Sequence, residues 1–278
     1  MKVLVTGAAG QLGQELVVRL QPLHDVVAWS RAEMDLTRHR DVREAVLAIG
    51  PDAIFNCASF NQVDLAEDQQ LTALEVNAMA VGTLARAAAV LGAVLVQYST
   101  DFVFAGTATA PYSEDDLPEP RSVYAQSKLI GEWLAADAGR YYVLRVESLF
   151  GGPHRRSSVD RIVEAIRAGT PATVFVDRVV SPSFVADVVS ASMFVVDSRP
   201  AFGLYHCVNS GHATWFEVGR EIARQLNAPD TALSPVSVHD VKLRASRPQF
   251  AALNNHKLAR AGFAMPSWQD ALGRYLTT

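Results

Sequence analysis

The stretch KVLVTGAAGQLGQEL, residues 2–16, begins with a β-branched apolar run and ends in an amphipathic helical pattern. Between the two lie three glycines in the spacing GxxGxxG: Gly7, Gly10 and Gly13. Glycines at a strand-to-helix turn let the backbone bend sharply and approach a pyrophosphate, whose charge the N–H groups and dipole of the helix N-terminus then hold. The stretch therefore predicts a dinucleotide site, with a tight turn that binds no ligand as the alternative.

The rest of the N-terminal half repeats this alternation of strand and helix. Apolar runs at 25–29, 52–56, 93–99 and 141–146 are separated by longer helical patterns. Strands that alternate with helices at this spacing form βαβ units and a parallel sheet. We expect an α/β fold in which residues 1–150 form a Rossmann-like, doubly wound parallel sheet that binds NAD(P).

The C-terminal half has a less regular rhythm of short strands and helices. Thr214 and Ser267 precede helical patterns and carry side chains that commonly cap helix N-termini. We expect residues 151–278 to form a smaller, mixed α/β substrate-binding lobe. Within it, the segment 172–200 is expected to pack back on the sheet.

Composition argues against several classes of protein. The 278 residues are 49% hydrophobic and 19% charged, which provides for a sizeable core, and the net charge of −4 argues against a non-specific nucleic-acid binder. Cys57 and Cys207 have no CxxC spacing and the seven histidines no HxxxH spacing, so we expect no disulfide framework and no metal site. No apolar run reaches the roughly 20 residues of a membrane helix. We expect a cytoplasmic protein without a membrane segment.

The end of the second predicted strand bears on the choice of cofactor. An acidic residue there would bind the ribose 2′-OH of NAD, but this chain has Ser30 and Arg31. Because a guanidinium can pair with a phosphate through two hydrogen bonds, we expect NADPH as cofactor, with NADH as an alternative. A solvated loop arginine is the other interpretation of Arg31.

Four polar residues are expected at the carboxyl edge of the sheet. Ser99 and Thr100 end the fourth strand, and Tyr124 and Lys128 lie four residues apart on the next helix, so they share one face. A carbonyl that receives a hydride needs a proton, which a tyrosine can donate. A neighbouring Lys⁺ favours the phenolate, so we expect Lys128 to lower the pKa of Tyr124. The Thr100 hydroxyl can hydrogen-bond the same carbonyl oxygen.

Together these features resemble the extended short-chain dehydrogenase/reductase family. Longer stretches narrow the resemblance to the dTDP-4-dehydrorhamnose reductase family. These stretches lie at residues 56–67, 76–88, 95–106, 111–132, 204–211 and 266–272.

The resemblance implies NAD(P)H-dependent reduction of the 4-keto group of a nucleotide-activated 6-deoxyhexose, and Thr100, Tyr124 and Lys128 as the catalytic set. We expect substrate contacts at Val63, Asp64, Thr100, Asp101, Ser148 and Arg247, although Arg247 could also be a surface or interface arginine. Asn77 could order a water for proton relay or brace the backbone. Cofactor contacts are expected at Gly7, Gly10, Gln11, Leu12, Gly13, Ser30, Arg31, Asp35, Leu36, Cys57, Ala58, Ser59, Asn77, Ser99, Tyr124 and Lys128.

The sugar-binding half departs from the pattern of this family. Ser148 stands where the family usually has a tryptophan that packs against the sugar, and Glu147 precedes it. Glu15 matches a glutamate that bridges metal-linked dimers in some relatives, but Ala186 replaces the second one, so we expect no metal and a monomer or homodimer.

Three alternatives therefore remain open. They are a 4-ketoreductase for another dTDP- or NDP-deoxysugar, an epimerase or dehydratase of the same fold, and a catalytically silent regulatory subunit. The intact set Thr100, Tyr124 and Lys128 favours a reductase, and the lack of a glutamate after Asp101 argues against dehydration.

Overall fold

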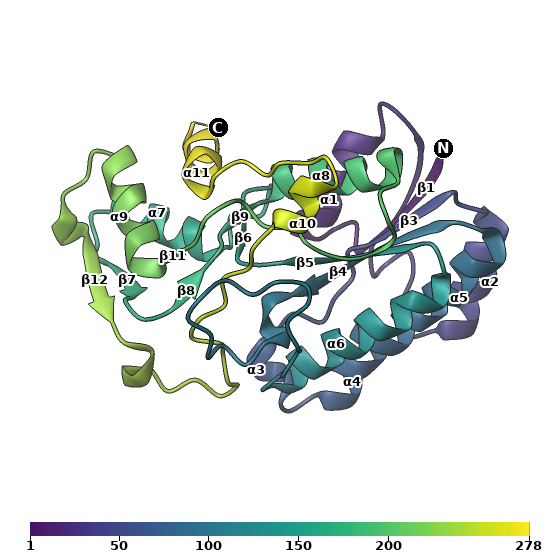
Figure 1. Ribbon diagram of the computed structural model, residues 1–278, viewed down its shortest axis with the longest axis horizontal. Helices are drawn as coiled ribbons and strands as arrows, with labels where there is room; N and C mark the ends of the chain where they lie inside the picture. Colours follow the sequence, from purple (N-terminus) through teal and green to yellow (C-terminus); the bar gives the residue numbers. More distant parts are fainter. Residues whose placement is uncertain (278) are drawn as a thin grey trace.

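A computed structural model describes residues 1–277, and its centre is one six-stranded sheet (Figure 1). All five pairings between neighbouring strands are parallel. The predicted α/β fold with a doubly wound parallel sheet is confirmed. In spatial order, the strands are β10 (Gly203–His206), β5 (Tyr141–Val146), β4 (Val94–Thr100), β3 (Ala53–Asn56), β1 (Lys2–Thr6) and β2 (Asp25–Trp29).

The order of the strands places a crevice above β1. From β1 the chain moves outward to β2 and then returns to the other side of β1 to form β3. Ligands of open α/β sheets bind at such a switch point, outside the carboxyl ends of the strands. A buried chain of side-chain hydrogen bonds crosses the sheet just below this edge, from Thr6 Oγ1 to Asn56 Oδ1 (2.6 Å) and from Asn56 Nδ2 to Gln97 Oε1 (2.6 Å).

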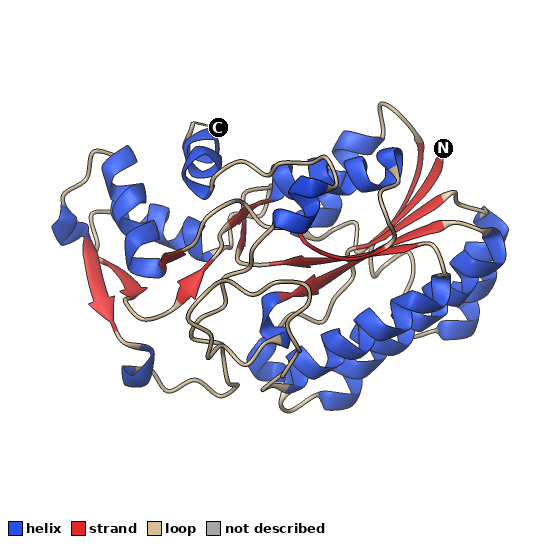
Figure 2. Ribbon diagram, viewed as in Figure 1, coloured by secondary structure: helices blue, strands red, loops and turns tan. Residues whose placement is uncertain are grey.

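Helices cover both faces of the sheet (Figure 2). On one face, α1 (Gln11–Leu20) and α8 (Val185–Ser198) bury aliphatic side chains against the strands. On the other face lie α2 (His39–Ile49), α5 (Ala80–Leu91) and α6 (Val123–Ala135). Because both faces are covered, the strands are almost continuously apolar, as is typical of parallel sheets.

The longest helix contains a π-helical turn. It runs from Gln70 to Leu91 through α4 (Gln70–Leu74), the π-helical η1 (Glu75–Met79) and α5. Its 22 residues are long and apolar enough to cross a membrane by length and composition, which corrects our expectation that no stretch of this chain reaches that length. Core helices of soluble proteins pass the same test, and 56% of this apolar window is buried against the rest of the protein.

A second, smaller core lies beside the sheet (left in Figure 1). It contains Phe150, Ile162, Val218, Ile222 and Trp268, all buried. Side chains cap its helices, including the predicted Thr214 and Ser267. Its elements are β6 (Leu149–Phe150), α7 (Ser158–Arg167), β7 (Ala172–Phe175), β8 (Val179–Val180), β9 (Ser183–Phe184), β11 (Ala213–Thr214), α9 (Trp215–Gln225), β12 (Leu233–Val236) and α11 (Trp268–Leu276).

The chain after residue 150 contributes to both cores. Of the segment 172–200, strand β7 lies in the smaller core and helix α8 lies on the sheet. Strand β10 and the short helix α10 (His256–Arg260) also pack with the sheet. The division of the chain at residue 150 remains a prediction.

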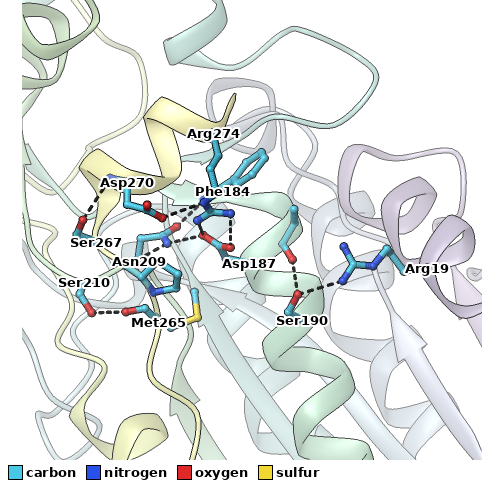
Figure 3. Close-up of polar contacts among 12 residues, drawn as sticks. Arg19, Phe184, Asp187, Ser190, Asn209, Ser210, Met265, Ser267, Asp270 and Arg274 are labelled. Carbon is cyan, nitrogen blue, oxygen red and sulfur yellow. Dashed lines mark hydrogen bonds and ion pairs between the residues drawn. The ribbon is translucent and has the colours of Figure 1, made fainter. Parts of the chain in front are cut away.

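A polar network joins the two cores, as Figure 3 shows. Asp187 on α8 accepts two hydrogen bonds from Arg274 of α11, at 2.9 and 2.7 Å, and one from Asn209 Nδ2 at 2.7 Å. The Arg274 guanidinium also lies 5.3 Å from the centre of the Phe184 ring. Because Asp187 is 8% exposed and fully paired, this contact fixes the smaller core against the sheet.

Candidate active site

One large cleft follows the carboxyl edge of the sheet, with a volume of about 1060 Å³. The strand ends, the N-termini of α1 and α7 and the first turns of α6 form its walls. Of the residues that the sequence predicts, Asn77, Asp64 and Arg247 do not line it. Those that do are Gly7, Gly10, Gln11, Leu12, Gly13, Ser30, Arg31, Asp35, Leu36, Cys57, Ala58, Ser59, Val63, Ser99, Thr100, Asp101, Tyr124, Lys128 and Ser148.

The glycine turn cannot accept larger residues at two positions. Gly7 has a φ of 66°, and a Cβ there would lie 2.5 Å from the Ala58 nitrogen. A Cβ on Gly13 would lie 2.3 Å from the Gly7 carbonyl oxygen. No side chain caps the N-terminus of α1, whereas Ser122 caps α6 and Ser157 caps α7. The uncapped end of α1 therefore faces the cleft with N–H groups that suit a phosphate.

The adenosine end of the cleft is formed by the loop after β2. Asp35 Oδ1 accepts hydrogen bonds from the Thr37 nitrogen (3.0 Å) and hydroxyl (2.9 Å), which lower the pKa of this carboxyl. The positive charges of Arg31 and Arg38 lower it further. Arg31 is exposed and lines the cleft, so its guanidinium is available to an anionic group.

Asn77 is buried in the π-helical turn, where it braces the backbone. Its Oδ1 accepts from the Phe60 nitrogen at 2.8 Å, and its Nδ2 donates to the Phe60 carbonyl at 3.0 Å and to Ser127 Oγ at 2.9 Å. Asn77 is 1% exposed and does not line the cleft. Of our two interpretations, these contacts support bracing: Asn77 ties the loop after β3 to the helix that carries Tyr124.

The dinucleotide fits the polar groups that this half of the cleft leaves open. Ser99 Oγ is buried, lines the cleft and has no hydrogen-bond partner among residues 1–277. Together with the uncapped α1, it offers polar groups that a bound ligand would satisfy. No group of three or more His, Cys, Asp or Glu residues within that range is arranged to hold a metal ion.

Helix α6 holds Tyr124 and Lys128 on the wall of the cleft. Lys128 is 4% exposed, and its Nζ donates to the Tyr98 carbonyl on β4 at 2.6 Å. Burial lowers the pKa of Lys128 to about 8, against the opposing charges of Glu132 and Cys57. Glu132 itself forms a buried ion pair with Arg145, with distances of 2.9 and 2.7 Å.

The Tyr124 phenol has a raised pKa rather than the lowered one that we expected. Burial raises it most, the Asp101 carboxylate raises it further, and the Thr100 hydroxyl opposes them. Lys128 does not offset these effects, because its ammonium is directed to the Tyr98 carbonyl. Tyr124 is therefore protonated at neutral pH, which is the form that a proton donor requires.

Asp64 and Arg247, which do not line the cleft, bind each other. The Arg247 guanidinium donates to both carboxylate oxygens of Asp64, at 2.9 and 2.7 Å, and the Ala245 nitrogen donates to the same group at 2.9 Å. The hydrogen bond from Arg247 is the main cause that lowers the pKa of Asp64 to about 2. Arg244 forms a second ion pair with Asp68. Each of these groups already binds the other, so a ligand would have to replace one of them. Our substrate contacts at Asp64 and Arg247 remain predictions.

Two charged residues that we had not placed in the site interact electrostatically with Asp101, the residue after Thr100. Arg178 lines the cleft, whereas Glu147 is 2% exposed and does not line it. Both Asp101 and Glu147 have raised pKa values, because both are buried. The signal in the sequence was a pair of charged residues within an otherwise apolar run, in VLRVESLF (143–150) and in TVFVDRVV (173–180).

Comparison with known proteins agrees with this geometry over the whole chain. The family model described as RmlD substrate binding domain matches residues 1–278. A dTDP-4-dehydrorhamnose reductase of Mycolicibacterium smegmatis is 32% identical over 277 residues, covering 98% of this chain and 84% of that protein. A probable dTDP-4,6-dihydroxy-2-methyloxan-3-one 4-ketoreductase of Streptomyces antibioticus is 34% identical, covering 98% of this chain and 93% of that protein.

A solved structure extends the match to three dimensions. The dTDP-4-dehydrorhamnose reductase of Bacillus anthracis, in complex with NADP, is 31% identical and has a TM-score of 0.94, covering 99% of this chain and 98% of that chain. The match covers almost the whole of this chain in sequence and in structure, and the chain belongs to the RmlD substrate binding domain family.

Proposed function

We propose that this chain is an NADPH-dependent oxidoreductase that reduces the 4-keto group of a nucleotide-activated 6-deoxyhexose, with dTDP-4-dehydro-L-rhamnose as substrate and dTDP-L-rhamnose as product. NADH is an alternative reductant. The observation that carries the proposal is that Thr100, Tyr124 and Lys128 line the same cleft as the uncapped glycine turn. The names of relatives with 31–34% identity, one of them solved with NADP, support the substrate and the cofactor.

The residues of the chain fit the reduction of a ketone. NADPH, when bound, supplies a hydride to the carbonyl carbon, and the electron pair of the C=O bond moves to the oxygen. Tyr124 donates a proton to that oxygen, and water from the open cleft returns one to the phenolate. Thr100 stabilises the developing charge on the oxygen with a hydrogen bond. Lys128, held by the Tyr98 carbonyl, places a positive charge in the wall on which Tyr124 lies.

A coupled assay tests this function. The protein is given dTDP-4-keto-6-deoxyglucose and NADPH, with and without the 3,5-epimerase that makes the rhamnose precursor, while NADPH absorbance is followed. Turnover only with the epimerase is the expected result. The absence of turnover under both conditions, in a folded protein that binds NADPH, contradicts the proposal.

A second candidate is the 4-ketoreduction of another deoxysugar. The Streptomyces antibioticus relative, whose name is that of such a ketoreductase, supports it, as does Ser148 at a position where an aromatic residue is expected. Turnover without the epimerase favours this candidate. An epimerase or dehydratase would instead leave NADPH unconsumed and change the sugar.

The state of the protein in the cell remains a prediction. We infer that it is a cytoplasmic monomer or homodimer that binds neither nucleic acid nor membrane. Light scattering after size-exclusion chromatography measures the oligomeric state, and cell fractionation measures the location.

A further inference from the structure

The loop after β2 brings an acidic side chain back to the end of that strand. Ser30 directly follows Trp29, the last residue of β2, and the Trp29 carbonyl accepts from the Ala8 nitrogen of the glycine turn at 3.0 Å. The sequence has Ser30 and Arg31 where an acidic residue would bind the ribose 2′-OH of NAD. Glu33 folds back over this position, and its Oε2 accepts from the Ser30 nitrogen at 2.8 Å. The structure therefore returns a carboxylate to the end of β2.

A closed turn holds this carboxylate in place. The Ala32 nitrogen donates to Ser30 Oγ at 3.1 Å, and the Met34 nitrogen donates to the Ser30 carbonyl at 3.1 Å. Hydrogen bonds from the Ser30 side chain and backbone lower the pKa of the exposed Glu33, so its carboxylate is ionised at neutral pH. Glu33 does not itself line the cleft, but its neighbours Arg31 and Met34 do. A negative charge is thus fixed at the edge of the cleft.

Arg31 and Glu33 place opposite charges at this end of the cleft. The exposed Arg31 side chain forms no hydrogen bond or ion pair within residues 1–277. A 2′-phosphate carries about two negative charges, so Arg31 attracts it and Glu33 repels it. A ribose 2′-OH can instead donate a hydrogen bond to a carboxylate. Asp35, the other carboxylate of this loop, already accepts two hydrogen bonds from Thr37.

We propose that Glu33 is a specificity-determining residue: its carboxylate repels the 2′-phosphate of NADPH and accepts a hydrogen bond from the ribose 2′-OH of NADH. Glu33 thereby limits the preference for NADPH that Arg31 provides, and the two residues together let the protein use both dinucleotides. The proposal rests on the proposed function, because it concerns the cofactor of the same reaction.

The variant Glu33→Gln tests the role of the charge. Its amide keeps an oxygen that can accept from the Ser30 nitrogen, so the turn is preserved while the negative charge is removed. Calorimetry with NADP⁺ and with NAD⁺, in the absence of sugar, measures Kd for each dinucleotide. We expect the ratio of Kd for NADP⁺ to Kd for NAD⁺ to fall roughly tenfold, mainly because NADP⁺ binds more tightly. An unchanged ratio would show that Glu33 only closes the turn, and overturns the proposal.

Glu44→Gln is the matched control, because it removes another exposed carboxylate, on α2, outside the cleft. Its ratio of Kd values should stay at the wild-type value. Salt provides a second readout, since it screens the repulsion between exposed charges. The difference in Kd for NADP⁺ between Glu33→Gln and the wild type should therefore shrink from low to high ionic strength. A difference that is independent of salt places its cause in the shape of the turn and overturns the proposal.

These binding measurements need no ketosugar, so they separate this proposal from the proposed function. A protein whose ratio of Kd values responds to Glu33→Gln, but which reduces no ketosugar, supports the role of Glu33 and contradicts the proposed function. A protein that reduces the ketosugar, but whose ratio is the same in Glu33→Gln and in the wild type, supports the proposed function and overturns the role of Glu33.

Discussion

The two ends of the cleft satisfy their polar groups in different ways. At the cofactor end, the N-terminus of α1 is uncapped, Ser99 Oγ has no partner within residues 1–277 and Arg31 is exposed. Beside the sugar end, Arg247, which does not line the cleft, is already bound to Asp64. The uncapped N-terminus of α1 and the exposed Arg31 are therefore available to an anion. The sugar end must exchange internal partners for a ligand, so substrate choice is expected to depend on that end.

The largest effect is expected from a change that breaks the sugar end alone. Tyr124→Phe removes the proton donor and should lower kcat about 10²- to 10⁴-fold, while the affinity for NADPH stays at the wild-type value. Stopped-flow rates and a fluorescence titration measure the two quantities. Tyr205→Phe is the matched control, because its hydroxyl donates to the Ala201 carbonyl away from the cleft. A near-normal kcat in Tyr124→Phe would refute the role of this residue.

The converse change breaks the cofactor end. A Cβ on Gly13 would lie 2.3 Å from the Gly7 carbonyl, so Gly13→Ala must displace the turn. Overpacking of this kind costs about 1–3 kcal/mol, and we expect calorimetry to show NADPH binding weakened roughly 10- to 100-fold. Gly273→Ala is the control, since a Cβ there meets nothing closer than 3.6 Å. Wild-type affinity in Gly13→Ala would show that the turn does not hold the cofactor.

The sequence predicted the cofactor end better than the sugar end, because local patterns determine the former. The strand, the glycines and the helix of residues 2–20 are contiguous, so their spacing alone indicates the turn. The position of Asp64 beside Arg247 depends instead on a contact between residues 183 positions apart. No periodicity or propensity in either segment reports such a contact.

The same reasoning explains why the sequence identified Tyr124 as a site residue but predicted the wrong direction for the shift of its pKa. Tyr124 and Lys128 share a helix face, which the spacing predicts, and both line the cleft. The pKa depends on burial and on the charge of Asp101, which come from other elements of the fold. Lys128 turns to a carbonyl on β4, and a single helix pattern contains no information on that neighbour.

The variant Arg31→Ala tests whether this exposed arginine determines the preference for NADPH over NADH. Arg31→Ala removes a guanidinium that can pair with the 2′-phosphate, so the preference for NADPH over NADH in kcat/KM should fall roughly tenfold. Arg40→Ala is the control, because that arginine is exposed on α2 and pairs with Glu44 at 2.9 Å. An unchanged preference in Arg31→Ala would mean that this arginine is only solvated.

The smallest effects are expected from changes to the ion pair between Asp64 and Arg247. Asp64→Asn weakens the ion pair with Arg247 and leaves its guanidinium available to a diphosphate, so KM for the nucleotide sugar should fall several-fold. Asp68→Asn removes a charge from the same segment but leaves Arg247 paired, so KM should not change. A rise of KM in Asp64→Asn would show that Asp64 itself contacts the sugar.

The pH dependence of the free energy of unfolding of Asp64→Asn tests the same ion pair. The folded-state pKa of Asp64 is about 2, below the usual value for an aspartate, so the ion pair stabilises the fold above pH 4 and is lost as the pH falls toward 2. The Asp64 side chain is 46% exposed, and solvent screening limits the contribution to less than about 1 kcal/mol. Urea unfolding should therefore show a small deficit for Asp64→Asn at pH 7 that shrinks between pH 4 and pH 2. A deficit that is constant over this range would mean that the Ala245 contact with Asp64, rather than the charge, holds the segment.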